Sequence, residues 1–470
     1  MHEGPDRLEE ENMKRLVIVS NRVPVPKEGL RPGGLAVVLH DLLALQGGMW
    51  FGWNGTTSAD AETTPPQMQQ AGGVEYATIG LTPAEHKHYY TGFSNSTLWP
   101  LMHSLPEFIH FERRELATYW SVNERFCANL LPLLRPDDTI WIHDYHLLPL
   151  AALLRRKGVK MPIGFFLHTP FPAPDMLAIA PDGGTFLRDM LCADLLGFQT
   201  SDDTANFIFA AQRTAGATLV THDTLQFEGH TVRVNTFPVE IDPEAFAKTA
   251  ADAIEVPELK QLRSSLAGRK LIFGVDRMDP TKGLCDRLAG YDRLLESYPI
   301  WQRNVTFLQI AAESRVDVPS YKALRAELEG LIGRLNSRRG QADWTPLRFL
   351  TRGSPRRVVS GYMRQAKIGY ITPLRDGMNL VAKEYVAAQD PDDPGVLILS
   401  RMAGAARQLD GALLVNPLDH DDLADALNHA LGMPREERRE RWRTCRRNLE
   451  GCTALGWGQA FLRTLEATVR

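Results

Sequence analysis

The chain has 470 residues, 44% of them hydrophobic and 23% charged, a composition that is typical of a folded globular protein and excludes disordered and fibrous classes. Lys and Arg number 53 against 57 Asp and Glu, so no overall excess of positive charge favours nucleic acid as a partner. No apolar run reaches the roughly 18 residues of a membrane span, and residues 1–12 do not resemble a signal peptide. Five scattered cysteines without a C-x-x-C pair fit a reducing compartment, and we expect a cytoplasmic protein.

Short apolar runs alternate with helical stretches along the whole chain. Continuous apolar runs, as opposed to alternating ones, are typical of strands that parallel sheets bury on both faces. Helical stretches such as 321–339 would supply the crossovers between them. The pattern predicts a doubly wound α/β fold. The predicted strands are 16–20, 139–143, 163–167, 195–198, 271–275, 305–310, 368–371, 396–399 and 413–415.

The number of strands indicates two sheets and therefore two domains. Residues 237–243 contain two prolines and break the periodicity, which places a boundary near residue 245. We expect a first domain over 14–245, a second over 246–450, and a C-terminal helix over 451–470 that packs back on the first domain. A cleft between two such domains, at the carboxyl ends of the strands, is the expected ligand site.

The loop after the first predicted strand carries Arg22, and Gly33 and Gly34 precede an apolar stretch of helical character. An arginine offers two parallel donors to a phosphate, and a glycine pair lets a ligand approach the N–H groups that open a helix. There is no G-x-G-x-x-G and no P-loop lysine, so an ordinary turn explains the glycines equally well.

Histidines and an aspartate follow the next two strands of the first half. His143, Asp144 and His146 come after the run at 139–143, and His168 comes after the run at 163–167. A doubly wound fold puts ligand-binding residues at such positions. The spacing of these four residues does not match a metal site, and a structural role for a histidine at a strand end remains the simpler interpretation of each alone.

Two further loops in the second half suit a phosphate ligand. Arg277 and Lys282 lie five residues apart in a glycine-bounded loop, as a diphosphate site would need, although a surface loop is the alternative. Arg315 could reach into the same cleft. Asp376 follows the strand at 368–371, and Glu384 lies eight residues further, so the two carboxylates could bind two ends of one extended ligand.

Taken together, these segments resemble the trehalose-6-phosphate synthases, which are retaining glycosyltransferases of the GT-B fold. The resemblance covers the chain from residue 15 onward. GT-B implies two doubly wound Rossmann-like domains that face a central cleft. The motifs that carry it are 19–22, 33–36, 50–53, 89–90, 93–100, 141–149, 164–168, the loop with Arg277 and Lys282, and 373–385.

The resemblance implies that glucose 6-phosphate is the acceptor. Arg22, Tyr90 and Arg315 match the residues that such enzymes use on the acceptor phosphate. Asp144 matches a contact to the acceptor sugar, and Trp99 matches a residue that shapes the acceptor pocket.

The resemblance also implies a nucleotide diphosphate glucose as donor, with UDP-glucose expected. The catalytic residues would be His168, Arg277, Lys282 and Asp376, the first and last of which hold the donor glucose. Donor binding would involve Gly33, Gly34, Arg277, Lys282, Leu380, Val381 and Glu384, the last on the ribose hydroxyls. No metal or other cofactor is expected, because Arg277 and Lys282 would neutralise the leaving diphosphate.

Two other functions remain open at this point. A related transferase would use another acceptor, such as glycerol 3-phosphate, but the retained acceptor residues argue against it. A catalytically silent sugar-phosphate sensor would have lost the donor loop, whereas Arg277, Lys282, Asp376 and Glu384 are all present.

Several positions depart from the family pattern. Asp276 and residues 280–281 differ beside the two cations, Gly353 and Ser354 occupy a stretch that contributes a nucleotide contact, and Glu240 replaces a common glycine at the domain join. The donor base therefore stays open between uridine, guanosine and adenosine. We expect a homo-oligomer, dimer or tetramer, and a separate trehalose-6-phosphate phosphatase as the next enzyme in the pathway.

Overall fold

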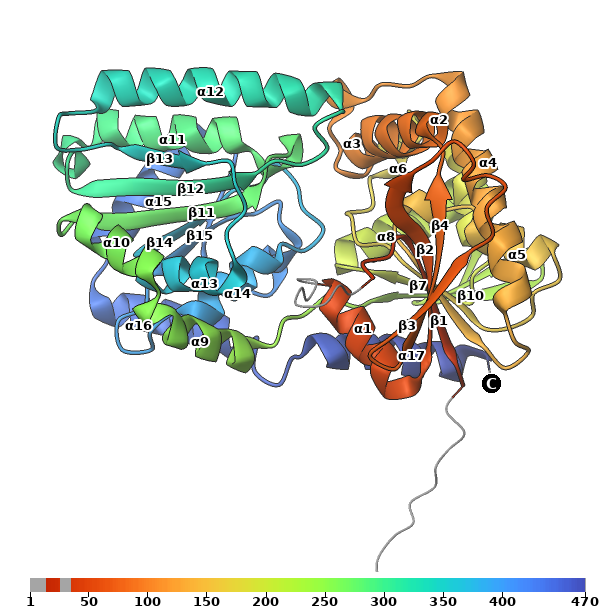
Figure 1. Cartoon of the computed structure of the whole chain (residues 1–470). Helices are drawn as coiled ribbons and strands as arrows, with labels where there is room; N and C mark the ends of the chain where they lie inside the picture. The colour runs from red at the N-terminus through yellow and green to blue at the C-terminus, as the bar shows by residue number, and fades with distance from the viewer. Residues whose placement is uncertain (1–13, 26–34, 470) are drawn as a thin grey trace, which may run out of the picture.

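Two twisted sheets, one in each half of the chain, form the framework of the molecule (Figure 1). The computed structural model describes residues 14–25 and 35–469. The fold class is the predicted one, α/β with two Rossmann-like domains. All nine predicted strands are present, and the predicted helix at 321–339 is Pro319–Arg339.

The first sheet has ten strands in the order β3-β4-β2-β1-β5-β6-β7-β10-β9-β8. The strands from β4 to β10 in this order are parallel, and antiparallel strands β3, β9 and β8 extend the two edges. The chain order reverses between β1 and β5, which is where a doubly wound sheet opens a crevice for ligands. The strands are β1 (Leu16–Arg22), β2 (Gly48–Thr57), β3 (Gln67–Ala71), β4 (Val74–Leu81), β5 (Thr139–His143), β6 (Ile163–Phe166), β7 (Leu195–Phe198), β8 (Thr218–Thr221), β9 (Thr224–Phe227) and β10 (His230–Thr236).

The second sheet has six strands, all parallel, in the order β13-β12-β11-β14-β15-β16. This is the Rossmann order 3-2-1-4-5-6, and its reversal lies between β11 and β14. The strands are β11 (Lys270–Arg277), β12 (Val305–Ala312), β13 (Leu347–Leu350), β14 (Ile368–Ile371), β15 (Val396–Ser400) and β16 (Leu413–Val415).

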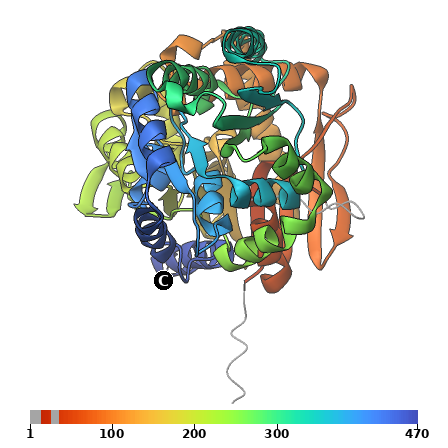
Figure 2. The same ribbon diagram turned by 90° about the vertical axis from the view of Figure 1, so that its left-hand side faces the viewer.

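Helices cover both sheets, and Figure 2, with the second domain toward the viewer, shows α12 end-on above its sheet. The helices of the first domain are α1 (Leu35–Gln46), α2 (Pro83–Glu85), α3 (Trp99–Met102), α4 (Arg113–Leu130), α5 (Leu150–Arg156), α6 (Pro174–Leu177), α7 (Gly183–Met190) and α8 (Ser201–Ala210), with a π-helix, η1 (His86–Leu98), between α2 and α3. Those that follow are α9 (Pro243–Asp252), α10 (Pro257–Leu266), α11 (Leu284–Ser297), α12 (Pro319–Arg339), α13 (Arg356–Gln365), α14 (Leu380–Ala388), α15 (His420–Gly432), α16 (Arg435–Arg447) and α17 (Ala454–Val469).

The last helix, α17, lies under the first domain although it follows the second in sequence (Figure 1). Trp457 and Phe461 pack beneath the first sheet, where Phe461 stacks on Trp141 with ring centroids 4.5 Å apart. Gly164 and Gly197 leave room for this ring, since a Cβ on either would come within 2.7 Å of it. The chain therefore crosses between the domains twice, once before α9 and once before α17.

The link before α9 holds a buried ion pair that involves Glu240. The Lys383 ammonium on α14 donates to Glu240 Oε2 at 2.7 Å and to the Val239 carbonyl at 2.8 Å, and the amide of Gln408 donates to Glu240 Oε1 at 2.8 Å. The Lys383 side chain is fully buried. Glu240, for which the sequence offers no role, thus ties the link between the domains to α14.

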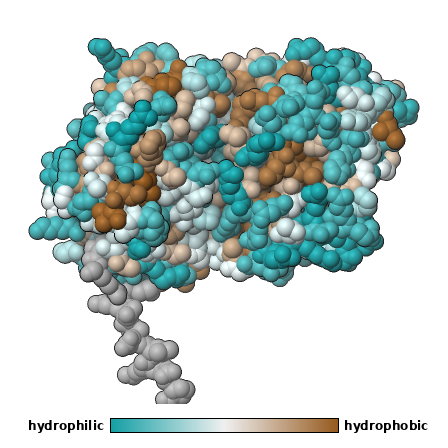
Figure 3. All heavy atoms as spheres, turned by 180° about the vertical axis from the view of Figure 1, so that it is seen from behind, coloured by the Kyte–Doolittle hydropathy of each residue, from teal (hydrophilic) through white to brown (hydrophobic). Residues whose placement is uncertain are grey.

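The surface is mostly polar. Figure 3, seen from behind, shows hydrophobic side chains in several separate patches. The most exposed large ones, such as Ile300, Leu418, Val220 and Leu45, belong to different elements. Among the described residues, no helix is both long and apolar enough to cross a membrane.

Candidate active site

The two domains meet at the carboxyl ends of their sheets through direct side-chain contacts. Arg315, in the loop after β12, donates from Nη2 to the Tyr145 hydroxyl at 3.1 Å. The indole N–H of Trp99 donates to Asp279 Oδ1 at 3.2 Å. Both contacts join residues from opposite domains, so the chain-order reversals of the two sheets face one interdomain cleft.

Arg315 is the central cation of this cleft. Its backbone has a positive φ of 47°, and its side chain is 8% exposed. The guanidinium carbon lies 4.0 Å from the centroid of the Trp99 ring, and Nη1 donates to the Tyr321 hydroxyl at 2.7 Å. Burial alone would lower the pKa of Arg315, but Tyr145, Tyr321 and Asp279 outweigh it and raise that pKa. The charge is therefore fixed and ready for an anion.

Asp279 organises the cations, and sequence reasoning missed it. It is fully buried, accepts from the Tyr321 hydroxyl at 2.8 Å, and lies 3.5 Å from Arg277 and 3.8 Å from Arg315. Although burial opposes it, the attraction of Arg277 and Arg315 lowers the pKa of Asp279 below its usual range. A signal was present, because Asp279 stands in the same loop as Arg277 and precedes a proline, as a helix-capping residue often does.

Arg277 ends strand β11 and reaches into the cleft. Its side chain is 47% exposed, and its guanidinium carbon lies 5.4 Å from the centroid of the Trp99 ring. Trp99 thus contacts both arginines from the opposite domain. The Trp99 ring and the buried Asp279 carboxylate hold this exposed guanidinium in place, so it can bind a phosphate without a change of conformation.

Lys282 and Asp376 form an ion pair. Lys282 lies in the segment between β11 and α11, and Asp376 lies in the loop between β14 and α14. Asn379 Nδ2 also donates to Asp376 Oδ2 at 2.9 Å, while Asn379 itself caps α14 by accepting from Ala382 N. Burial would raise the pKa of Asp376, but Lys282 outweighs it and lowers that pKa. Asp376 is therefore an ionised acceptor at the edge of the cleft.

A fully buried arginine, Arg287, supports the loop that carries Arg277 and Lys282. Arg287 on α11 pairs with Asp276 and donates to Gln309 at 3.0 Å, to Thr372 at 3.1 Å and to the Lys282 carbonyl at 3.1 Å. Asp276, one of the departures from the family pattern, is thus a structural partner of Arg287. The sequence could not single out Arg287, because it lies within an ordinary amphipathic helix.

Asp144 and His168 lie together on the first domain. The backbone N–H of His168 donates to Asp144 Oδ1 at 3.3 Å, and Asp144 has an unusual backbone conformation, with φ 76° and ψ 166°. Burial raises the pKa of Asp144 to about 6, against the opposing effect of its backbone donors and of Arg315. Burial lowers the pKa of His168 to about 3, so this imidazole is neutral at pH 7.

His143 contacts His168 and was not assigned a role from the sequence beyond a structural one. The two imidazoles stack with centroids 5.3 Å apart, and His143 Nδ1 lies 3.0 Å from His168 Nε2. His143, Asp144, His146 and His168 do not form a cluster of metal ligands, because within the described part of the chain the only such group is elsewhere.

Arg22 and Tyr90, both on the first domain, pack against the same tryptophan, Trp53. Arg22 ends β1 and is exposed, with its guanidinium carbon 5.9 Å from the centroid of the Trp53 ring. Tyr90, on η1, also packs on Trp53 and stacks on His146 with an interplanar angle of 12°. Trp53 therefore positions both the guanidinium and the phenol on the first domain.

Leu380, Val381 and Glu384 occupy the first turns of α14. Arg356 donates to Glu384 Oε1 at 3.3 Å, and burial raises the pKa of Glu384 against the effect of Arg356. Leu380 and Glu384 line a pocket of about 370 Å³ next to the link between the domains. Gly33 and Gly34 lie outside the described residues.

Gly377, on the second domain, packs directly against the backbone of His168 and Thr169 on the first. A Cβ at this position would lie 2.2 Å from the His168 carbonyl oxygen of the opposite domain, so only glycine fits. This contact, with those of Arg315 and Trp99, means that the cleft is closed in this structure.

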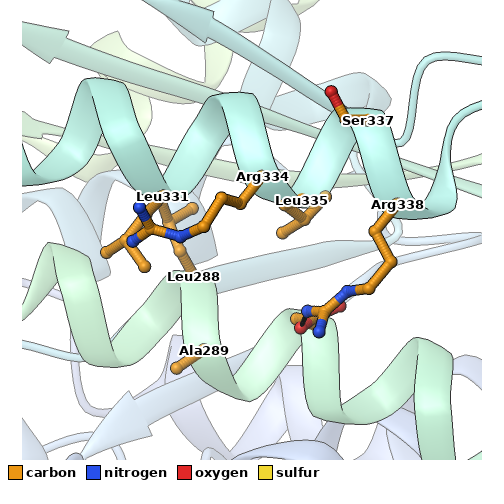
Figure 4. A pocket seen from close by; sticks show the side chains of 8 residues that line it. Leu288, Ala289, Leu331, Arg334, Leu335, Ser337 and Arg338 are labelled. Atoms are coloured by element: carbon orange, nitrogen blue, oxygen red, sulfur yellow. Dashed lines mark hydrogen bonds and ion pairs between the residues drawn. The ribbon is translucent and has the colours of Figure 1, made fainter.

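Another pocket lies on the second domain, between α11 and α12 (Figure 4). It has a volume of about 500 Å³ and is lined by apolar groups such as Leu288 and Leu331, together with Arg334 and Arg338. Asp292 pairs with Arg338, which removes much of the pocket's positive charge. None of the residues predicted for the site line it.

Comparison with known proteins gives consistent similarities over nearly the whole chain. The model of glycosyltransferase family 20 matches residues 14–467. A trehalose-6-phosphate synthase of Sinorhizobium fredii is 45% identical over 97% of this chain and 99% of the relative. The structure of a UDP-forming α,α-trehalose-phosphate synthase of Burkholderia xenovorans with glucose 6-phosphate has a TM-score of 0.91 at 44% identity, over 96% of this chain and 100% of that one. An Escherichia coli protein bound with UDP-2-fluoro glucose has a TM-score of 0.91 at 41% identity, over 96% and 99%.

Proposed function

We propose that this chain, which belongs to glycosyltransferase family 20, transfers glucose from UDP-glucose to glucose 6-phosphate and releases UDP and α,α-trehalose 6-phosphate. It is a glycosyltransferase of the GT-B fold. The observation that carries the proposal is the closed cleft, where Arg315 and Trp99 meet Tyr145 and Asp279 across the domain boundary.

The arrangement of charges supports two phosphorylated substrates. Arg22 and Arg315 flank the side of the cleft that Tyr90 lines, which suits a sugar phosphate whose ester carries about two negative charges at pH 7. Arg277 and Lys282 lie on the second domain and suit a diphosphate. These fixed cations would stabilise the negative charge that develops on the leaving group. Such electrostatic stabilisation is the strongest catalytic effect that these residues offer.

The neutral His168 and the ionised Asp376 support a role on the donor sugar. A neutral imidazole and a carboxylate are a donor–acceptor set for sugar hydroxyls, and both lie beside the contact of Gly377 with the first domain. Held in this way, the anomeric carbon would stay close to the acceptor hydroxyl and gain from proximity. Asp144 would accept a hydrogen bond from the acceptor sugar.

We propose that transfer retains the anomeric configuration through attack on the same face from which the diphosphate leaves. The anomeric carbon loses its bond to the diphosphate oxygen and gains one to the acceptor hydroxyl oxygen. The hydroxyl proton moves to the departing phosphate oxygen. No nucleophile of the protein takes part, and Arg277 and Lys282 supply the positive charge that a metal ion supplies in other transferases.

UDP-glucose is the proposed donor, with Glu384 on the ribose hydroxyls. A Cβ on Gly353 would meet nothing within 4 Å, so the segment near the base is open in this chain. The assay therefore has to include guanosine and adenosine donors. We also propose action in the cytoplasm, homo-oligomerisation, and a separate phosphatase that consumes the phosphorylated product.

A nucleotide-release assay tests the function. Purified enzyme is mixed with glucose 6-phosphate and UDP-, GDP- or ADP-glucose in turn, with chelator present, and the product is identified by mass and NMR. We expect UDP release that depends on glucose 6-phosphate, with a 1,1-linked disaccharide phosphate. Arg277→Ala should lower kcat by about 10²–10³, whereas Arg277→Lys should retain part of it.

The same assay separates the alternatives. Glycerol 3-phosphate in place of glucose 6-phosphate tests for another acceptor. Binding of a donor without release from any combination would favour a silent sensor and contradict the proposal. Near-normal kcat in Arg277→Ala would remove the assigned role of that residue.

A further inference from the structure

A cluster of potential metal ligands lies outside the cleft, at the start of α4. His110, Glu112 and Glu115 each offer one ligand atom, and these atoms all lie within 4.8 Å of one another. His110 and Glu115 line a pocket of about 690 Å³, to which the second domain contributes Asp317 and Ser320. None of these side chains has a part in the proposed glycosyl transfer.

Glu115 is the unusual member of the cluster. Its residue is 8% exposed, yet carboxylate Oε2 has no hydrogen-bond partner in the structure. A buried carboxylate without partners is expensive unless a cation or a proton compensates it.

The chain leaves space for this carboxylate. Gly92, on the π-helix η1, packs directly against it, and a Cβ at Gly92 would lie 2.5 Å from Glu115 Cδ and Oε1. A π-helix is often found where a chain builds a functional site. The carboxylate is therefore held in place on one side by α4 and on the other by the backbone of η1.

We propose that His110, Glu112 and Glu115 bind one divalent cation of the Zn²⁺ or Co²⁺ type. One imidazole and two carboxylates are a donor set that these borderline ions accept, and water would complete the coordination. Ligand distances of about 2.0–2.2 Å require the ligand atoms to draw slightly closer than they lie here. The side chains of His110 and Glu112 are 68% and 57% exposed and can turn inward, with Glu115 as the fixed anchor.

Titration with Co²⁺ tests the site, because the visible absorption of Co²⁺ reports its ligands. The protein is used as the full chain without a polyhistidine tag. We expect one Co²⁺ per chain and a rise in Tm on its addition. Since changes around a metal ligand already weaken binding about 10–100-fold, Glu115→Gln should weaken it by at least as much, and Gly92→Ala should weaken it by displacing the carboxylate.

A matched control lies in the same pocket. Glu107 lines it but is not part of the cluster, so Glu107→Gln should bind Co²⁺ as the wild type does. Equal binding by the wild type, Glu107→Gln and Glu115→Gln would place the ion elsewhere and overturn the proposal. Absence of binding up to about 1 mM Co²⁺ would overturn it as well. These readouts do not depend on glycosyl transfer, so their failure and that of the proposed function are distinguishable.

Discussion

At the scale of single residues, burial decides which groups in the cleft carry charge. It raises the pKa of Asp144 to about 6 and lowers that of His168 to about 3. At pH 7–8 Asp144 is therefore ionised and His168 is neutral. The cleft keeps one carboxylate in a position that costs stability, which is common where a group is retained for binding and not for folding.

Asp144→Asn should stabilise the protein at alkaline pH. The pKa of Asp144 is higher in the folded protein than its ordinary value of 3.8, so the folded state binds this proton more tightly than the unfolded state does. The stability that the proton contributes is fully present below about pH 4 and is lost as the pH rises to about 6. At pH 8 the free energy of unfolding of the variant should exceed that of the wild type by roughly 1–3 kcal/mol, measured by urea unfolding.

The gain should shrink at pH 4.5, and transfer activity should fall at either pH. Asp137→Asn is the control, since Asp137 is exposed on the same domain and should change neither value. A gain of equal size at pH 8 and pH 4.5 would mean that ionisation of Asp144 is not its cause.

Some of the site was predictable residue by residue, and some was not. Arg22, Arg277 and Arg315 stand directly after strands or in glycine-bounded loops, and parallel sheets bring such loops together. Asp279 meets Trp99 across 180 positions of sequence, and no local pattern encodes that pair. Which side chain a buried carboxylate contacts depends on how the two domains pack, and this was outside the reach of sequence reasoning.

At the scale of elements, α14 carries the proposed nucleotide end and is tied to the link between the domains. Lys383 faces the link, where Glu240 neutralises it, while Glu384 faces the pocket. Adjacent residues on a helix point in different directions, so one short helix serves both purposes.

Lys383→Met should destabilise the protein by about 3–5 kcal/mol, because it leaves the Glu240 carboxylate buried without its counter-ion. The double variant Lys383→Met/Glu240→Leu should recover most of the loss, since removal of both charges also removes the desolvation cost. Thermal and urea unfolding of the four proteins give the coupling free energy. A double variant no more stable than Lys383→Met would show that packing, and not charge, is the contribution of the pair.

Most of the strands that the sequence predicted are buried on both faces, although β16 is partly exposed and the largely buried strands β2 and β4 were missed. The missed strands include β3 and β8, whose residues are almost all exposed and which pair antiparallel at the edges. Their sequences are polar or short, so no continuous apolar run marks them. The π-helix η1, which packs against α4, was missed for another reason: no pattern of residue types in the sequence distinguishes a π-helix from an α-helix.

At the scale of the whole molecule, the two domains act as halves of one site. The second domain supplies Arg277, Lys282 and Arg315, and the first supplies Arg22. Polar contacts between side chains, such as Trp99 to Asp279 and Arg315 to Tyr145, join the two halves. Interfaces of this kind favour relative motion of the domains. We therefore expect the cleft to open for substrate entry and to close for transfer.

Gly377→Ala should test this closure, because a methyl group at Gly377 collides with the His168 carbonyl only when the domains are together. The variant should keep the Tm of the wild type, give a more extended small-angle scattering profile with UDP and glucose 6-phosphate, and lose most of its kcat. Gly333→Ala is the matched control, since a Cβ there meets nothing within 4 Å. If Gly377→Ala scatters like the wild type and turns over normally, transfer does not need the contact between Gly377 and the first domain. Closure would then not be required for transfer, and a rigid, already open cleft would have to admit and align both substrates.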